Sequence, residues 1–305
     1  MRHSSEIKIY RGRFAPSPSG HLHFGSLLAA TASYLQARQQ NGEWWLRIED
    51  IDPPREVAGS SKHIIKTLKD FGFEWDNLSY QSQRQDYYQH YLQTLLNTEQ
   101  AYFCGCSRKD ISQENKLNTT APNLYPGTCR TGLNGKPARA VRFKVEDSVL
   151  LIEDAIQGKH SLDLSKTCGD FILKRADGFY SYQLAVAIDD SIQDISQVVR
   201  GYDLFESSFN QKMIQQALGL HSPEYAHIPV AISQQGLKLS KLSAAKDIAT
   251  EPANKVIFQI LQILGQQPPN ELQHQDINKI WKWTFSHWEL NKIPQKQNVY
   301  SPVSD

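Results

Sequence analysis

The alternation of strand-like and helix-like segments near the N-terminus is the feature that most constrains the fold. Residues 7–14 alternate in polarity as a strand does, and after a polar turn apolar residues recur at helical spacing from Phe24. The run GEWWLRIEDI at 42–51 predicts a second strand, and residues 60–72 predict an amphipathic helix that opens with serine and closes with glycine. Two such strand-helix units predict an α/β protein with a doubly wound parallel sheet.

The middle of the chain interrupts this pattern. A predicted helix at 86–98 leads into AYFCGCSRKDI, and from there to about residue 166 Asn, Thr, Gly and Pro dominate, with short strand-like runs. The α/β pattern then resumes, followed by two or three helices between 251 and 291 and a frayed tail from 293. We therefore expect four parts: the two halves of one α/β domain at 7–101 and 167–248, an insertion at 102–166, and a short helical C-terminal region at 249–305.

Composition limits the class of protein. With 33 basic and 32 acidic side chains the formal net charge is +1, so an RNA partner would have to meet a local basic patch. A chain of 305 residues can bury a large core without disulfides. Neither an apolar leader nor a run of about 18 apolar residues occurs, which predicts a cytoplasmic protein that does not span a membrane.

The first turn, RGRFAPSPSGHLHFGS at 11–26, is the first candidate site. It follows a predicted strand and precedes a predicted helix, where unpaired N–H groups can bind a phosphate. Gly20 and Gly25 permit close backbone approach, and His23 can donate a hydrogen bond to a phosphoryl oxygen. The alternative is an ordinary turn in which His23 caps the helix.

Two other polar stretches carry candidate ligands. In GLKLSKLS at 236–243, Lys238 and Lys241 flank Ser240 and could close over a triphosphate, unless this is a solvated basic loop. In LRIEDIDPPR at 46–55, a predicted strand ends in charged residues, and its carboxylates could bind an ammonium group. A salt-bridged turn would explain this second stretch equally well; its charged residues are Glu49, Asp50, Asp52 and Arg55.

These three motifs together resemble the class I aminoacyl-tRNA synthetases, specifically their glutamyl branch. The resemblance covers roughly residues 7–250, with HFGS at 23–26 in place of the family's HIGH motif and KLSKL at 238–242 in place of KMSKS. Ser26 and Leu242 are departures from those motifs. The resemblance implies a class I synthetase-type Rossmann fold with an inserted acceptor-type subdomain. It also implies that ATP, accompanied by Mg²⁺, activates glutamate.

The resemblance also assigns roles to individual residues. Arg13 and Arg200 would offer paired donors to substrate carboxylates, and Glu49 would pair with the ammonium group. The alternatives are a strand-end salt bridge for Arg200 and a half-buried strand aromatic for Tyr182. The full set is Arg13, Ala15, Ser17, Glu49, Tyr182 and Arg200 for glutamate, and Gly20, His23, Gly25, Lys238, Ser240 and Lys241 for ATP, with His23 and Lys241 as catalytic residues.

The cysteines indicate a metal site. Cys104, Cys106 and Cys129 are grouped, whereas Cys168 stands alone, which suits metal ligation better than two disulfides. Three thiolates and one further ligand would form a closed tetrahedral zinc site. In the resembled family the fourth ligand is a tyrosine, which matches Tyr125. His160 is an alternative donor, and three reduced cysteines without metal remain a further alternative.

The length of the chain points to one group within the glutamyl branch. Glutamyl-tRNA synthetases continue into an anticodon-binding domain, which we do not expect here. The chain resembles a truncated group in which glutamate is activated without tRNA and is then esterified to the cyclopentene-diol of queuosine, at the wobble position of tRNA(Asp). Its partners would be ATP, L-glutamate and queuosine-containing tRNA(Asp), and we expect a monomer. The alternatives are charging of a tRNA 3′ end and an inactive tRNA-binding paralogue.

Overall fold

The structure is a computed structural model that describes residues 9–117, 124–147, 149–233, 236 and 248–300. The helices are α1 (Phe24–Gln39), α2 (Ser60–Asp70), α3 (Gln85–Asn97), α4 (Arg108–Leu117), α5 (Leu164–Thr167), α6 (Tyr182–Ile192), α7 (Phe205–Ala217), α8 (Ala253–Ile263) and α9 (Ile277–His287). The strands are β1 (Arg11–Phe14), β2 (Glu43–Ile48), β3 (Asn77–Tyr80), β4 (Ala101–Cys104), β5 (Ala140–Phe143), β6 (Val149–Asp154), β7 (Gly158–Asp163), β8 (Ile172–Lys174), β9 (Gln197–Gly201), β10 (Glu224–Ile228), β11 (Val230–Ile232) and β12 (Asn298–Tyr300).

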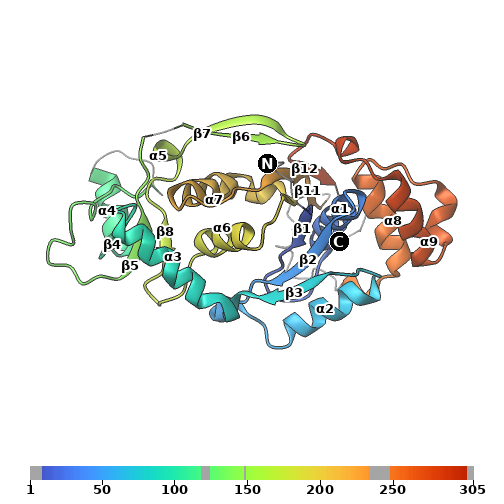
Figure 1. Cartoon of the computed structure of the whole chain (residues 1–305), viewed down its shortest axis with the longest axis horizontal. Helices are drawn as coiled ribbons and strands as arrows, with labels where there is room; N and C mark the ends of the chain where they lie inside the picture. Colours follow the sequence, from blue (N-terminus) through green and yellow to red (C-terminus); the bar gives the residue numbers. More distant parts are fainter. Residues whose placement is uncertain (1–8, 118–123, 148, 234–235, 237–247, 301–305) are drawn as a thin grey trace, which may run out of the picture.

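The molecule is elongated (Figure 1). Helices α8 and α9 lie at one end beside α1, and α4, β4 and β5 lie at the other. The helix predicted from Phe24 is confirmed, because α1 begins at that residue. None of the helices in the described part of the chain has the length and apolar character needed to cross a membrane.

The centre of the fold is built from two sheets that meet edge to edge. Strands β1, β2 and β3 pair in parallel in that order, and β9, β10 and β6 form a second parallel set to which β7 adds an antiparallel strand. At the junction, Ser196 N donates to Arg11 O over 2.8 Å, and Arg11 N donates to Ser196 Oγ over 3.0 Å. The strand order therefore reverses between β1 and β9.

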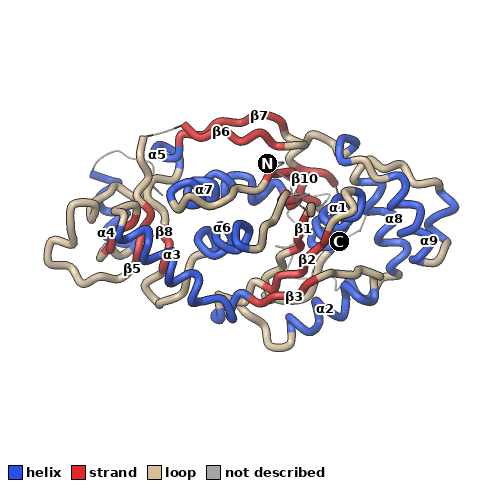
Figure 2. The backbone as a smooth tube through the Cα atoms, viewed as in Figure 1, coloured by secondary structure: helices blue, strands red, loops and turns tan. Residues whose placement is uncertain are grey.

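Helices cover both faces of this central sheet (Figure 2). Val199, Ala226 and Ile228 pack into one core with α1, α8 and α9. Their strand neighbours Val198 and Tyr225 point the other way, into a second core with α3, α6 and α7. This alternation confirms the predicted α/β fold with a parallel sheet, and places α6 against the face opposite α1.

A separate antiparallel sheet, in the order β4-β5-β8, forms the far end of the molecule. The sheets interleave with the four parts expected from the sequence. Strands β6 and β7, within 102–166, join the sheet of β9 and β10, whereas β8, within 167–248, pairs with β5. Strand pairing joins segments that are distant in sequence, and the composition along the chain does not record which strands share a sheet.

The C-terminal region is helical, as predicted, and α8 and α9 pack against α1. Trp281 Nε1 donates to Phe71 O over 3.0 Å and Trp288 Nε1 donates to Gln36 Oε1 over 3.0 Å, which fixes this region to the first helices. The expected frayed tail is wrong as far as residue 300, because β12 pairs in parallel with β11.

Candidate active site

Two adjoining cavities lie at the carboxyl ends of β1 and β9, where an open α/β sheet binds its ligands. The first has a volume of about 320 Å³ and the second about 390 Å³, and both are lined by Ser17, Ser19 and Tyr182. Glu49 lines the second cavity. The other residues predicted to bind glutamate or ATP, within the described chain, line the first cavity: Arg13, Ala15, Ser17, Gly20, His23, Gly25, Tyr182 and Arg200. The predicted ATP residues Lys238, Ser240 and Lys241 lie outside the described residues.

His23 is the N-cap of α1, so the capping role considered above is correct. Its Nδ1 accepts a hydrogen bond from the backbone N–H of Ser26 over 3.3 Å. A peptide N–H can only donate, so in the neutral ring the proton sits on Nε2. Burial lowers the pKa of His23, although the charge of Asp203 opposes this, so the ring is neutral at pH 7. The cap therefore leaves Nε2–H as the one N–H donor of His23, which lies in the cavity wall 3.2 Å from Ser26 Oγ.

Two glycines shape the loop before α1. A Cβ on Gly25 would lie 3.2 Å from the ring of His23, so only glycine leaves that ring undisturbed. Gly20 has a φ of +146°, which side-chain-bearing residues rarely adopt. Ser60 Oγ accepts from Gly20 N over 3.2 Å and also donates to its carbonyl. Ser60 thus fixes the loop; it does not cap α2, whose N-cap is Gly59.

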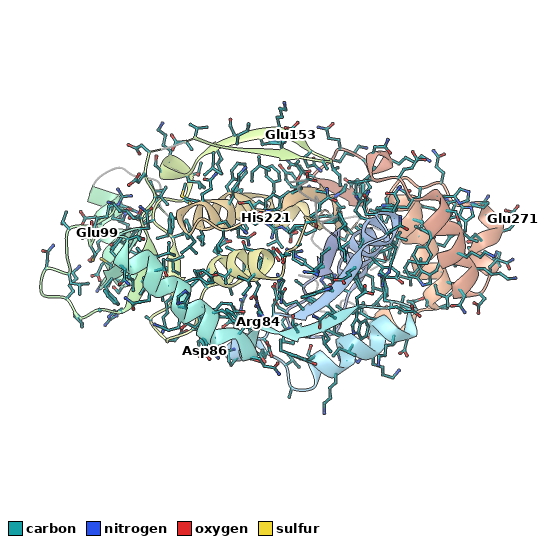
Figure 3. The ribbon with its side chains drawn as sticks, in the orientation of Figure 1. Arg84, Asp86, Glu99, Glu153, His221 and Glu271 are labelled. Carbon is teal, nitrogen blue, oxygen red and sulfur yellow. The ribbon has the colours of Figure 1, made fainter. Side chains whose placement is uncertain are left out.

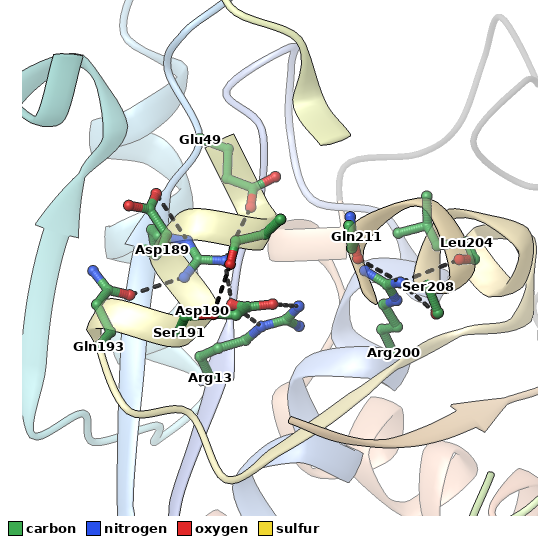
Figure 4. Close-up of polar contacts among 12 residues, drawn as sticks. Arg13, Glu49, Asp189, Asp190, Ser191, Gln193, Arg200, Leu204, Ser208 and Gln211 are labelled. Carbon is green, nitrogen blue, oxygen red and sulfur yellow. Dashed lines mark hydrogen bonds and ion pairs between the residues drawn. The ribbon is translucent and has the colours of Figure 1, made fainter. Parts of the chain in front are cut away.

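Arg13 is held by a buried carboxylate that the sequence did not identify. Its Nε and Nη2 donate to the two oxygens of Asp190 over 3.2 and 3.1 Å (Figure 4). Burial raises the pKa of Asp190, but the charges of Arg13 and Arg47 outweigh it and hold the pKa at about 2. The paired donors predicted to bind a substrate carboxylate therefore bind Asp190. Among the described residues, Nη1 of Arg13 has no partner and remains for a ligand.

Arg47 is fully buried at the centre of the same network. Its Nη2 donates to Asp190 over 2.7 Å, its Nη1 donates to Gln193 over 2.8 Å, and its Nε lies 3.9 Å from Asp189. Arg84 also pairs with Asp189; Figure 3 shows it beside the start of α3. The sequence signals for this network were an arginine inside an apolar strand and two adjacent acids inside an apolar helix.

Glu49 is the one buried acid of its motif. It follows β2 and its side chain lies 3.5 Å from Arg47 Nη2. Burial raises the pKa of Glu49 to about 7, against the charges of Arg47 and Arg13. Asp50 instead accepts from Ser82 N and Oγ over 2.8 and 2.7 Å, and Asp52 pairs with two exposed or half-exposed arginines. The motif is therefore partly a salt-bridged turn, and Glu49 alone is placed to meet an ammonium group.

Arg200 is a buried cation whose partners are neutral, with 4% of its surface exposed. It has no carboxylate partner in the described part of the chain, so the salt bridge considered above is not formed there. Nη1 donates to Tyr182 Oη over 3.3 Å. Tyr182 opens α6 and does not lie in a strand. Nε of Arg200 donates to His227 Nε2 over 3.2 Å. Figure 4 shows the contacts of Nη2, which donates to Leu204 O (3.2 Å), Ser208 Oγ (2.7 Å) and Gln211 Oε1 (2.9 Å).

A buried charge without a counter-ion is costly, so Arg200 marks a place for an anionic ligand. His227 does not supply positive or negative charge there, because burial lowers its pKa to about 4. Its Nδ1 lies 2.6 Å from Asp154 Oδ2, which fixes the proton on Nδ1 and leaves Nε2 to accept from Arg200. Asp154 and His227 were not identified from the sequence, and they position Arg200.

The predicted metal ligands come together in the antiparallel part of the fold. The Sγ atoms of Cys104, Cys106 and Cys129 lie within 4.8 Å of one another. Tyr125 Oη lies 3.3 Å from Cys104 Sγ and 3.8 Å from Cys106 Sγ. A tetrahedral zinc ion with bonds of about 2.3 Å would hold its sulfur ligands about 3.8 Å apart, so this set of donors fits zinc.

The alternative donor His160 is not part of this group in the described chain. Its ring packs on Phe205, and its Nε2 lies 3.1 Å from Gln157 O. Cys168 is also separate and is partly buried, with its Sγ 3.5 Å from Asn210 Oδ1. Arg142 Nε lies 3.3 Å from Cys104 Sγ, so a cation borders the cysteine group.

Comparison with known proteins identifies the class. Residues 10–272 match the family model described as tRNA synthetases class I (E and Q), catalytic domain, so the chain belongs to that family of ligases. A glutamate tRNA ligase from Elizabethkingia meningosepticum, solved in complex with its amino acid, superposes with a TM-score of 0.81 and 26% identity. It is matched over 96% of this chain and 67% of its own.

Curated relatives place the chain within this class. Glutamyl-Q tRNA(Asp) synthetase of Chromobacterium violaceum is 44% identical over 288 residues, which cover 94% of this chain and 96% of the relative. The protein of the same name from Dechloromonas aromatica is 44% identical over 297 residues, covering 96% of this chain and 99% of the relative. The chain belongs to the family of glutamyl-Q tRNA(Asp) synthetases.

Proposed function

We propose that this protein activates L-glutamate with ATP to glutamyl-adenylate and transfers the glutamyl group to queuosine at the wobble position of tRNA(Asp). The relatives that match nearly the whole chain support this assignment of substrates. The observation that carries the choice of amino acid is Arg200, a buried cation with neutral partners among the described residues. Tyr182, its partner, also lines the cavity of Glu49. An amino acid with a second carboxylate suits this arrangement.

The reaction decides which carboxylate faces Arg200. The α-carboxylate must reach the α-phosphorus of ATP beside the N-terminus of α1, so the side-chain carboxylate is the one that stays against Arg200. Nη1 of Arg13 supplies a further donor, and Glu49 accepts the ammonium group. Ala15 and Ser17 lie in the loop after β1 and line the first cavity.

Activation then proceeds by in-line attack of the α-carboxylate on the α-phosphorus, with pyrophosphate as the leaving group. Nε2–H of His23 and the free N–H groups of the α1 N-terminus stabilise the growing phosphoryl charge, and Gly20 and Gly25 let the phosphates approach. Mg²⁺ enters with ATP. The KLSK motif contributes Lys238 and Lys241, which neutralise the charge of the departing pyrophosphate, and Ser240 between them contacts ATP.

The transfer step needs positioning more than it needs a strong base. A hydroxyl of the queuosine diol attacks the carbonyl of the mixed anhydride, and AMP leaves as a good leaving group. The second cavity, which shares Ser17 and Tyr182 with the first, gives that hydroxyl an approach to the adenylate.

A structural zinc ion belongs to the proposal. Cys104, Cys106, Tyr125 and Cys129 would hold it, and its bonds would tie β4 to the loop at 124–129. We further propose a cytoplasmic monomer. Transfer RNA and ATP meet in the cytoplasm.

A pair of assays tests the proposal. Glutamate-dependent exchange of pyrophosphate into ATP, measured without tRNA, reports activation. Labelled glutamate is then offered with tRNA(Asp) containing queuosine, with tRNA(Asp) lacking it, and with tRNA(Glu). We expect exchange without tRNA and transfer to the first tRNA alone. Transfer to tRNA(Glu) would mean charging of a 3′ end, and absence of exchange would mean an inactive paralogue.

A further inference from the structure

An edge strand of the antiparallel sheet carries an exposed aromatic ring. Phe103 lies on β4, an edge strand of this sheet, and its side chain is 50% exposed. The register places Phe103 opposite Val141, and Val141 opposite Lys174 at an irregularity in the pairing of β5 with β8, and all three residues line one open cavity. The ring therefore stands at the edge of the sheet, with a cation in the lining of the same cavity.

The surroundings of this ring are basic. Phe103 lines an open cavity of about 250 Å³ whose lining includes Arg139, Lys174 and Arg175 and no acidic residue. Arg175 is neutralised by Asp52 and Asp177. Lys174 lies 4.9 Å from the ring of Tyr180, and neither it nor Arg139 forms an ion pair with a described residue.

Two nearby carboxylates, Asp110 and Asp177, lie outside the lining of this cavity. Asp110, which lies within electrostatic reach of Arg139, accepts hydrogen bonds from Ser107 N and Oγ over 2.7 and 2.9 Å. Asp177 is held by Arg175. The patch defined by Phe103, Arg139 and Lys174 is thus locally positive on a chain whose net charge is only +1.

This patch is continuous with the active site. Arg175 lines both the cavity of Phe103 and the second active-site cavity. Ile172 and Lys174 occupy alternate positions on β8, so their side chains lie on the same side of the strand. Ile172 lines the second active-site cavity and Lys174 lines the cavity of Phe103. A polymer that places one unit in the second cavity would therefore lay the next units over the patch.

We propose that an unpaired nucleotide next to the modified one in the tRNA anticodon loop stacks its base on Phe103, while Arg139 and Lys174 contact its phosphates. This inference rests on the proposed function, which brings a loop nucleotide into the second cavity. Single-stranded RNA is bound in this way, by aromatic rings under the bases and cations along the backbone.

The test separates RNA binding from activation. Phe103→Ala, Phe103→Tyr, Arg139→Ala and Lys174→Ala are compared with Leu151→Ala and Lys159→Ala, which change exposed residues of β6 and β7. Each variant is assayed for pyrophosphate exchange without tRNA and for transfer as a function of tRNA concentration. Normal exchange shows that a variant is folded. Absence of pyrophosphate exchange in the parent protein would contradict the proposed function, whereas the change in KM for tRNA among the variants tests this inference.

We expect Phe103→Ala to raise the KM for tRNA by roughly 5- to 150-fold while exchange is unchanged, because one stacked base is lost. Phe103→Tyr keeps the ring and should stay near the parent value. Arg139→Ala should also reduce the salt dependence of tRNA binding, by about 0.7 in the slope of log K against log salt. An unchanged KM for Phe103→Ala, or an equal rise for Leu151→Ala, would overturn the inference.

Discussion

Nε of Arg200 donates a hydrogen bond to Nε2 of His227 over 3.2 Å, in a place where both side chains are buried. The histidine is neutral because burial lowers its pKa to about 4, so it orients the guanidinium without cancelling its charge. Asp154 fixes the tautomer that makes this possible. The cation therefore stays available for the carboxylate of a ligand.

We predict that His227→Phe raises the KM for glutamate by about 10- to 100-fold, because Nε–H of Arg200 loses its acceptor. His227→Gln retains an acceptor and should lie between this variant and the parent. The KM for ATP should not change. Pyrophosphate exchange at varied glutamate measures this, and thermal unfolding of each variant separates a positioning effect from loss of the fold. Equal KM values for His227→Phe and the parent would contradict the positioning role.

Glutamate binding should depend on pH through Glu49. Its pKa is about 7 in the free protein, so its carboxylate is mostly protonated at pH 6 and mostly charged at pH 8. The ammonium group requires the charged form, so the KM for glutamate should fall about tenfold per pH unit below 7 and level off above. Glu49→Gln should raise the KM and flatten the profile. A profile that persists in Glu49→Gln would assign it to another group.

Stability should respond to the same group with the opposite sign. The folded-state pKa of Glu49 is raised above its value in the unfolded chain, so its contribution is most favourable below about pH 4.5 and is lost as pH rises through 7. Glu49→Gln should therefore raise the free energy of unfolding at pH 8 by about 1–3 kcal/mol relative to the parent, with little difference at pH 4. Denaturant unfolding at the two pH values measures this. A gain of equal size at both pH values would contradict this account of the buried carboxyl.

The zinc proposal predicts one metal ion per chain. Cys129→Ser removes one of the three clustered thiols and should lose the metal, which elemental analysis of the purified protein measures. Cobalt substitution in the parent should give the absorption of a tetrahedral thiolate site, and Tyr125→Phe should alter that spectrum. Cys168→Ser is the matched control because Cys168 lies outside the cluster. Metal-free parent protein, purified without chelator, would contradict the proposal.

The sequence predicted what local patterns determine. Periodicity placed α1 from Phe24, and the motif at 46–55 supplied Glu49. The sequence analysis did not predict hydrogen-bond partners that meet only in the folded chain. Arg13 and Asp190 are 177 residues apart, and Arg200 and His227 are 27 residues apart. No periodicity records such pairs. The interleaving of β6 and β8 between sheets escaped for the same reason, because pairing is decided by tertiary contacts.

The central claim is that Arg200 selects glutamate by its side-chain carboxylate. The most direct measurement is the KM for glutamate in tRNA-independent pyrophosphate exchange, compared between the parent and Arg200→Gln, with glutamine as a second substrate. We predict exchange with glutamate alone in the parent and a KM at least about 100-fold higher in the variant, at unchanged KM for ATP. Equal KM values in the two proteins, or exchange supported by glutamine in the parent, would contradict the claim.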